Sequence, residues 1–288
     1  QRLNHPMTPS TRLRLWLQYH FSGDNLAPSI IIAINVLVWL ASITVGGLNP
    51  FSPSPAQLGE WGGNFALATF TGEGWRLFTS MFMHAGILHL FMNMLLLQSI
   101  GAMTVQRFGR WGFVQLYLLG GLLASAASAW WQSHTLISTR TGANVGALGL
   151  AQPALNLIVS VGASGAIFAV CGALLAVIVR AKITGNWMYG FDVATKNALL
   201  RVVGINIAIG FMIKGIDQSA HVGGLLAGLL LGLVLPIVAM RQTRARKLAG
   251  YALACLLAAG LLGLAFATAN YTQLQQVNEL FEQHTTQP

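Results

Sequence analysis

Four polar side chains lie at the starts of apolar segments of this chain. Ser164 stands in a Gly-Ala-Ser-Gly sequence that opens one segment, His221 opens another, and His89 and Asn93 lie near the start of a third. Burying such groups in hydrocarbon costs several kcal/mol unless they face a partner or a wet cavity. A hydroxyl, two imidazoles and an amide at matching depth therefore indicate a hydrolase assembled inside a membrane.

Ser164 is the candidate nucleophile. A serine hydroxyl reacts only when a base removes its proton and nearby donors stabilise the oxyanion that forms. Gly162 and Gly165 allow a tight turn, and the Ser164 amide is free to donate because the first amides of a helix lack internal partners. The alternative is that these small residues form only a packing or turn motif.

His221 is the candidate base, and the glycines after it indicate how it meets Ser164. Glycines spaced by four residues leave one helix face without side chains, and they are Gly224, Gly228 and Gly232. The segment after Ser164 has a matching small face, formed by Gly165, Ala169, Gly172, Ala173 and Ala176. Contact between these faces would bring hydroxyl and imidazole within ~2.6–3.2 Å. The glycines could instead serve packing alone, and both readings can hold together.

His89 and Asn93 are four residues apart, so on a helix they share one face. Two donors in this arrangement can complete an oxyanion hole with the Ser164 amide. A zinc site is the competing interpretation, but the H-E-x-x-H pattern lacks both its glutamate and its second histidine here. We therefore expect no metal and no cofactor. His84, five residues earlier, is expected to hold the loop by hydrogen bonds.

Two further groups have ordinary explanations. Trp75 and Arg76 precede the His89 segment, and such a pair is typical of an anchor at the membrane interface. Asp217 is the only acid near His221, so it is a candidate third member of a triad. A loop carboxylate four residues before the histidine is more often a solvated surface group, and we favour that interpretation.

Composition sets the class of protein. Charged residues make up 8% of the 288 residues, 55% are hydrophobic and the mean hydropathy is +0.62. A soluble domain carries about 25% charged residues, so the chain is an integral membrane protein. We expect an all-α, polytopic transmembrane helix bundle with seven apolar segments, at 28–46, 85–105, 111–131, 163–180, 198–213, 220–240 and 249–268.

The cations predict the orientation of these segments. With the N-terminus inside, thirteen Lys and Arg residues fall on the inner side and only Arg76, Arg140 and Lys214 on the outer side. The positive-inside rule therefore predicts a cytoplasmic N-terminus, with the C-terminus and the four polar side chains on the extracytoplasmic side. A bacterial inner membrane fits this pattern. The net charge of +9 does not indicate nucleic-acid binding, because the cations are not gathered in one basic module.

Taken together, the motifs resemble those of the rhomboid family of intramembrane serine proteases. The ordered set comprises Trp75-Arg76, His84, His89-x3-Asn93, Gly162-x-Ser164-Gly165 and Ala220-His221 followed by spaced glycines such as Gly224. The resemblance implies a cytoplasmic segment at 1–27, a six-span core at 28–240, a linker and seventh span at 241–268, and an extracytoplasmic tail at 269–288. The seventh span looks like the bacterial 6+1 arrangement.

The resemblance also implies the roles of the residues. Ser164 is the nucleophile and His221 the general base of a dyad without a carboxylate, while His89, Asn93 and the Ser164 amide form the oxyanion hole. Trp75 and Arg76 are similar to a membrane-embedded motif of the first loop. Many members carry Tyr four residues after the nucleophile, whereas this chain has Phe168, which can stack on the imidazole but cannot donate a hydrogen bond.

The sequence thus predicts an endopeptidase that cleaves single-span or polytopic membrane proteins in the lipid bilayer. The short fifth segment, with Gly204, Asn206 and Gly210, is the candidate lateral gate for the substrate. One alternative is a catalytically silent relative that binds membrane-protein clients. A transporter is a weaker alternative, because a substrate path would place polar groups through the whole membrane depth.

Overall fold

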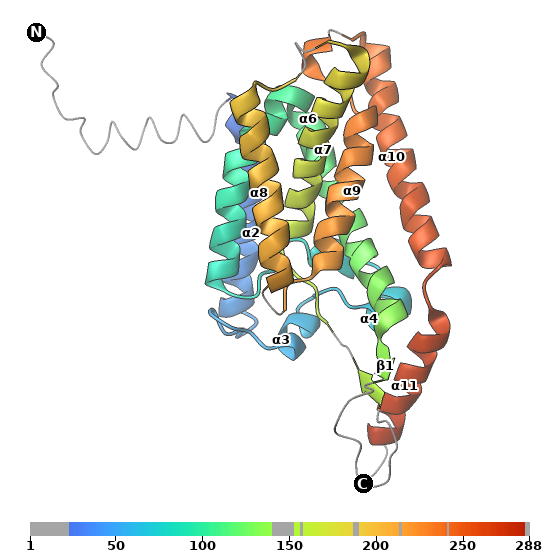
Figure 1. The fold of residues 1–288 in the computed structure, drawn as a ribbon. Coiled ribbons are helices and arrows are strands. Elements are labelled where there is room, and N and C mark those ends of the chain that lie inside the picture. Colours follow the sequence, from blue (N-terminus) through green and yellow to red (C-terminus); the bar gives the residue numbers. More distant parts are fainter. Residues whose placement is uncertain are drawn as a thin grey trace, which may run out of the picture.

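The protein folds into a bundle of long helices (Figure 1). The computed structural model describes residues 23–139, 153–155, 158–186, 190–212, 215–240 and 242–285. Six helices in these ranges are long and apolar enough to cross a membrane, which confirms the predicted all-α membrane bundle. They are α2 (Leu26–Thr44), α6 (Ile87–Thr135), α7 (Ser164–Thr184), α8 (Val193–Met212), α9 (Gln218–Val234) and α10 (Arg244–Ala267).

Short elements occupy the two ends of the bundle. The helical ones are η1 (Gly23–Asn25), α3 (Pro55–Glu60), α4 (Ala66–Phe70), α5 (Arg76–Thr79), η3 (Val238–Met240) and α11 (Tyr271–Thr285). Two short antiparallel strands, β1 (Ile137–Thr139) and β2 (Pro153–Leu155), pair with each other. The loop expected at 47–84 therefore contains three short helices, and the first of them is fixed by a capping box between Ser54 and Gln57.

Helix α6 contains the second and third expected segments in one run of 49 residues. At 1.5 Å per residue such a run would measure about 73 Å, more than twice the ~30 Å of hydrocarbon. Its backbone breaks at Gly109, where φ is 74° and ψ is 171°, and Figure 1 shows the two halves as separate helices. The sequence predicted a loop at 106–110 between these segments, and this prediction was wrong in length. The change of chain direction occurs at one glycine with a positive φ.

Other segment boundaries also differ from the expected ones. Helix α8 begins at Val193 rather than 198, α9 ends at Val234 rather than 240, and α10 begins at Arg244 rather than 249. The hydroxyl of Thr243 caps α10 by accepting a hydrogen bond from Arg246 N at 3.3 Å. The apolar run of a sequence marks the part of a helix that faces lipid, whereas the capping residue sets where the helix begins. The first turn of a helix can therefore contain charged residues that lie outside the apolar run.

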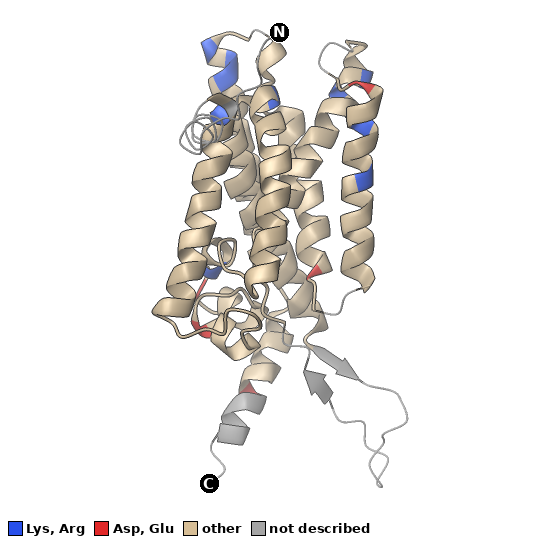
Figure 2. Ribbon diagram, turned by 90° about the vertical axis from the view of Figure 1, so that its left-hand side faces the viewer, with Lys and Arg blue, Asp and Glu red and all other residues tan. Residues whose placement is uncertain are grey.

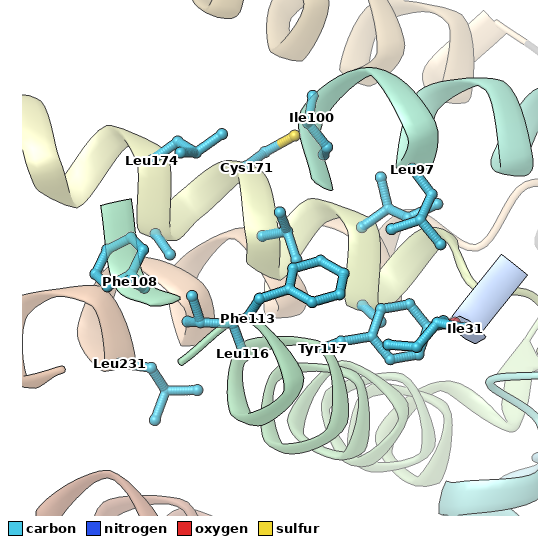
Figure 3. Close-up of a cluster of buried hydrophobic side chains, with 14 of the residues drawn as sticks. Ile31, Leu97, Ile100, Phe108, Phe113, Leu116, Tyr117, Cys171, Leu174 and Leu231 are labelled. Carbon is cyan, nitrogen blue, oxygen red and sulfur yellow. The ribbon is translucent and has the colours of Figure 1, made fainter. Parts of the chain in front are cut away.

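The core lies where α6, α7 and α9 meet. Large side chains such as Phe108, Phe113, Leu116 and Tyr117 are fully buried there, and they pack against Leu174 of α7 and Leu231 of α9 (Figure 3). Helices α8 and α10 lie at the periphery, with most of their side chains directed away from the protein. Three central helices therefore form the rigid part of the bundle, and the start of α7 and the start of α9 lie in it.

The chain after α10 forms α11, which lies beyond the end of α10 on the side of α4 (Figure 1). Leu274 and Val277 of this helix are buried in a small cluster with Phe70 of α4, and the Phe70 ring lies edge-on to Phe266 with the centroids 5.0 Å apart. The segment expected as an extracytoplasmic tail thus contains a helix that packs on the first loop.

Lys and Arg residues gather at the end of the bundle away from α3 and α4, as Figure 2 shows. Cations of α6, α7 and α10, among them Arg110, Lys182 and Lys247, are exposed there. The starts of α7 and α9 face the opposite end. The two ends therefore differ in charge in the way that the sequence predicted.

Candidate active site

Ser164 and His221 lie next to each other at the starts of α7 and α9. The Ser164 Oγ atom is 2.9 Å from His221 Nε2, although the two residues are 57 positions apart. His221 is only 8% exposed. A hydroxyl within hydrogen-bond distance of an imidazole nitrogen is the arrangement that general-base activation of a nucleophile requires.

Glycines produce this proximity. A side chain at Gly224 would overlap Gly165 O, and one at Gly228 would overlap Ala169 O. On the other helix, a Cβ at Gly172 would overlap Leu225 O. The backbones of α7 and α9 are therefore in direct contact, as the two small faces of the sequence predicted. This contact is called the α7–α9 seam below.

Phe168 lies one turn after Ser164 and fixes the plane of the imidazole. The Phe168 and His221 rings stack with their centroids 4.4 Å apart and an angle of 18° between the planes. If Ser164 donates its proton to His221 Nε2, the imidazole proton lies on Nδ1. That Nδ1 atom is buried and has no hydrogen-bond partner in the described part of the chain. Stacking rather than a third polar group thus orients this histidine.

His89 lies against the turn that precedes Ser164. A Cβ added to Gly162, whose φ is 126°, would lie 2.7 Å from His89 Cε1 and 3.0 Å from His89 Nε2. The Ala85 amide donates to His89 Nδ1 at 3.3 Å. Because Nδ1 accepts, the proton of the neutral ring lies on Nε2, on the side that faces Gly162. His89 is therefore a donor beside the nucleophile.

Asn93 lies one turn further along α6 and is 6% exposed. Its Nδ2 atom donates to His89 O at 3.0 Å, and a side-chain amide nitrogen carries a second proton that remains for a ligand. His84 packs its ring against that of His89, with centroids 5.2 Å apart, and its Nδ1 lies 3.2 Å from Phe82 O. Burial, with a smaller contribution from His89, lowers the pKa of His84 to about 3.

The strand-like segment before Ser164 is held by the first loop. Asn64 and Ser160 exchange two backbone hydrogen bonds, with N···O distances of 3.0 and 2.7 Å, and the Gly162 amide donates to Ser80 O at 2.8 Å. Nothing in the sequence indicated these contacts, because they are backbone hydrogen bonds between residues about 80 to 95 positions apart. They fix the turn that presents Ser164.

Arg76 is not the interfacial anchor that the sequence predicted. Only 8% of it is exposed, and its Nη1 donates to Gly59 O and Gly63 O while its Nε donates to Glu73 Oε2 at 2.7 Å. Its guanidinium also lies 4.7 Å from the centre of the Trp75 ring. Arg76 therefore organises the first loop from within, and Trp75, which is 51% exposed, provides the outward-facing surface.

Asp217 was expected as a solvated surface group, and this expectation was wrong. Its Oδ1 caps α9 by accepting from Ala220 N at 3.1 Å and also accepts from Ser219 Oγ, while its Oδ2 accepts from Ser128 Oγ of α6. Gln132 Nε2 donates to the same Ser128 hydroxyl at 3.1 Å. The carboxylate thus ties the start of α9 to α6 and is not hydrogen-bonded to His221. Its short spacing before an apolar run was the signal of an N-cap.

The sequence-predicted residues therefore fall into two groups. In the first group, Ser164 contacts His221, which stacks on Phe168, and Asn93 donates to His89 O. The ring of His89 lies against His84 and the Gly162 turn, and Gly165 and Gly224 meet in the seam. Trp75 and Arg76 belong to the first loop. Among the described residues, no three His, Cys, Asp or Glu side chains are placed to hold a metal ion.

The fold and this geometry describe a helical membrane protein with a serine and a histidine meeting near one end of the bundle. Residues 71–237 match the family described as the Rhomboid domain, which is more than half of the chain. The chain therefore belongs to the rhomboid family.

Curated relatives agree with this assignment. "RHOMBOID-like protein 4" of Arabidopsis thaliana is 35% identical over 192 residues, which are 66% of this chain and 41% of that protein. "Rhomboid protease GluP" of Bacillus subtilis (strain 168) is 28% identical over 257 residues, 88% of this chain and 44% of GluP. "Rhomboid protease AarA" of Providencia stuartii is 25% identical over 214 residues, 72% of each chain. The match with the first two spans less than half of their length.

Proposed function

We propose that this rhomboid-family protein is an intramembrane serine endopeptidase that cleaves other membrane proteins through Ser164 and His221. The observation that carries the proposal is the 2.9 Å separation of Ser164 Oγ and His221 Nε2 beside the Gly162 turn. Two relatives, GluP and AarA, are named as rhomboid proteases.

The proposed reaction is acyl transfer. His221 Nε2 takes the proton of Ser164 as Oγ attacks the scissile carbonyl carbon, and the carbonyl oxygen becomes an oxyanion. The oxyanion accepts hydrogen bonds from His89 Nε2, Asn93 Nδ2 and the Ser164 amide. When the tetrahedral intermediate collapses, His221 gives the proton to the leaving amine. Water then attacks the acyl-enzyme, again with His221 as the base, and Ser164 recovers its proton.

Orientation follows from the charges at the two ends. The positive-inside rule supports a cytoplasmic position for the cation-rich end, and the proposed side of the starts of α7 and α9 is then extracytoplasmic. A bacterial inner membrane is the proposed location. The substrate approaches from the lipid beside α8, whose outer face is exposed along most of its length. Unwinding of the substrate helix near the outer surface then exposes the scissile carbonyl.

Ser164→Ala tests the proposal. The purified variant should lose all detectable cleavage of a single-span model substrate in detergent, while circular dichroism and the melting temperature stay as in the wild type. Ser99→Ala is the matched control, because Ser99 is a hydroxyl of α6 that donates only to Leu95 O within its own helix; it should cleave normally.

Labelling by a fluorophosphonate separates a protease from a silent client-binding relative. Mass spectrometry should find the probe on Ser164, and His221→Ala should prevent the reaction because the hydroxyl then lacks its base. Cleavage by Ser164→Ala would contradict the mechanism. A folded wild-type protein that neither cleaves nor reacts would support the silent relative instead.

A further inference from the structure

A cavity at the cation-rich end of the bundle lies far from the serine. It has a volume of about 140 Å³ and forms where the break in α6, the chain that follows α9 and the second turn of α10 meet. Phe108 and Pro236 are buried side chains of its wall. The break in α6 is at Gly109, where a positive φ changes the direction of the chain, and the next two residues line the cavity together with residues of α10. None of the motifs discussed above accounts for this cavity.

Two cations, Arg110 and Lys247, line the cavity, and neither forms an ion pair with a carboxylate among the described side chains. Arg110 uses one guanidinium nitrogen, Nη2, to donate to Gly23 O at 3.2 Å. For Lys247, in the second turn of α10, the described part of the chain provides neither a hydrogen-bond acceptor nor an ion-pair partner for Nζ. Two positive charges around one small space favour an anion in it.

Two aromatic residues complete the lining. Trp111 is 75% exposed although it is large and apolar, and Tyr251 directs a hydroxyl-bearing ring to the same space from α10. Trp and Tyr gather where a bilayer changes from hydrocarbon to headgroups. The cavity therefore lies at the level where lipid phosphates occur, with buried apolar side chains on one wall and cations on another.

We propose that this cavity binds the phosphate of an anionic phospholipid headgroup. Arg110 and Lys247 pair with the phosphate, Trp111 and Tyr251 flank the headgroup, and the acyl chains lie along the exposed face of α10. Basic pockets between membrane helices are suited to such headgroups because each cation near the surface adds to the attraction for an anionic lipid. A lipid held there contacts α6, the chain after α9 and α10 at the same time.

Native mass spectrometry of the full chain tests this site. The protein is titrated with phosphatidylglycerol, and with phosphatidylcholine as a lipid of the same chain length without net charge. Wild type should retain one phosphatidylglycerol in preference to phosphatidylcholine. The double variant Arg110→Gln/Lys247→Gln should bind it about 25-fold more weakly, because each cation is worth roughly fivefold in affinity.

The matched control is Arg244→Gln/Arg246→Gln. It removes two positive charges from the same end of the bundle, but these two exposed residues do not line the cavity. This control should bind phosphatidylglycerol as the wild type does. Lys247→Gln alone removes no hydrogen bond within the described residues, so it should weaken binding about fivefold with an unchanged fold.

Three results would overturn the proposal. Equal weakening in both double variants would mean that binding reflects only the net charge of this end. Equal retention of phosphatidylcholine would mean that the anionic charge is not recognised. Displacement of the lipid by millimolar inorganic phosphate, with phosphate alone raising the melting temperature of wild type but not of Lys247→Gln, would assign the cavity to a free anion. Because no readout is proteolysis, failure here is distinct from failure of the proposed function.

Discussion

Helices α7 and α9 pack closely against each other at the seam, whereas α8 packs loosely against the same bundle. In the most apolar stretch of α7, 67% of the residues are buried, against 17% in that of α8. Gly172, Gly224 and Gly228 meet backbone directly at the seam, whereas the space around Gly204 of α8 is open. Lipid tails are as apolar as side chains, so burial of apolar area does not hold helices together here. Close backbone contact therefore decides which helices are fixed.

This difference in packing matches the roles proposed above, in which the seam positions the reacting residues and the substrate approaches beside α8. The seam holds the serine and histidine at 2.9 Å. Helix α8 is attached beside them by a few buried side chains, such as Leu199 and Val203, and by a hydrogen bond from Gln218 Nε2 to Ile207 O at 3.0 Å. A protease in a membrane needs both a rigid reacting pair and a passage for a large substrate. The contrast between these regions is open to direct tests.

The largest expected effect comes from filling the seam. Gly228→Ala places a methyl group against Ala169 O, which neither backbone can avoid without separating the helices. The change should destabilise the protein by at least about 2 kcal/mol, as overpacking against a fixed neighbour does, and should greatly reduce cleavage by moving His221 from Ser164. Thermal unfolding in detergent and substrate cleavage measure both effects.

Gly204→Ala is the matched control for this substitution. It adds the same methyl group to a helix that crosses the same membrane, but into open space. Stability should be unchanged or raised by up to about 1 kcal/mol, because alanine favours the helix more than glycine does. If Gly204→Ala destabilised the protein as much as Gly228→Ala does, close backbone contact at the seam would not explain the effect.

An intermediate effect is expected from Asp217→Ala. The first turn of α9 loses its cap and Ser128 loses its acceptor, which together should cost about 1–2 kcal/mol. His221 lies in that turn, so kcat should fall several-fold with little change in KM. Asp192→Ala is the control, because Asp192 accepts from Thr195 N at 2.9 Å at the start of α8. Its kcat should stay normal, and an equal loss in both variants would argue against a role in positioning His221.

The smallest effect should come from releasing α8. Gln218→Ala removes the hydrogen bond to Ile207 O, and a net loss of about 1 kcal/mol corresponds to a fivefold change. If α8 moves to admit substrate, kcat/KM for a single-span substrate should rise two- to fivefold and the amides of α8 should exchange faster. Gln115→Ala breaks a similar contact, to Tyr251 O at 3.4 Å between α6 and α10, and should leave kcat/KM unchanged. A fall in kcat/KM on Gln218→Ala would oppose α8 as the gate.

The sequence predicted those features that depend on periodic pattern. Small residues spaced by four on two segments predicted the seam, and the i, i+4 spacing of His89 and Asn93 predicted their shared face. Each of these patterns is local to one helix, where the 3.6-residue period fixes which side chains share a face. The ring of Phe168 stacked on His221 was instead implied by the family resemblance and not by the spacing.

Features that depend on distant partners were missed. Asp217 was interpreted as solvated because its acceptor role toward Ser128 joins residues 89 positions apart. Arg76 was interpreted as an anchor because its acceptors are the backbone carbonyls of Gly59 and Gly63, which no side-chain pattern reveals. Hydropathy also could not distinguish a loop from the single-residue break at Gly109, since both interrupt an apolar run.

The seam has a consequence for how this protein can change over generations. Every single-base change of a glycine codon that alters the amino acid introduces at least a methyl group, and at Gly172, Gly224 and Gly228 that group would collide with a main-chain oxygen. No one-step missense variant at these three positions keeps the original geometry. The relative position of the serine and the histidine therefore depends on glycines that pack against neighbouring helices.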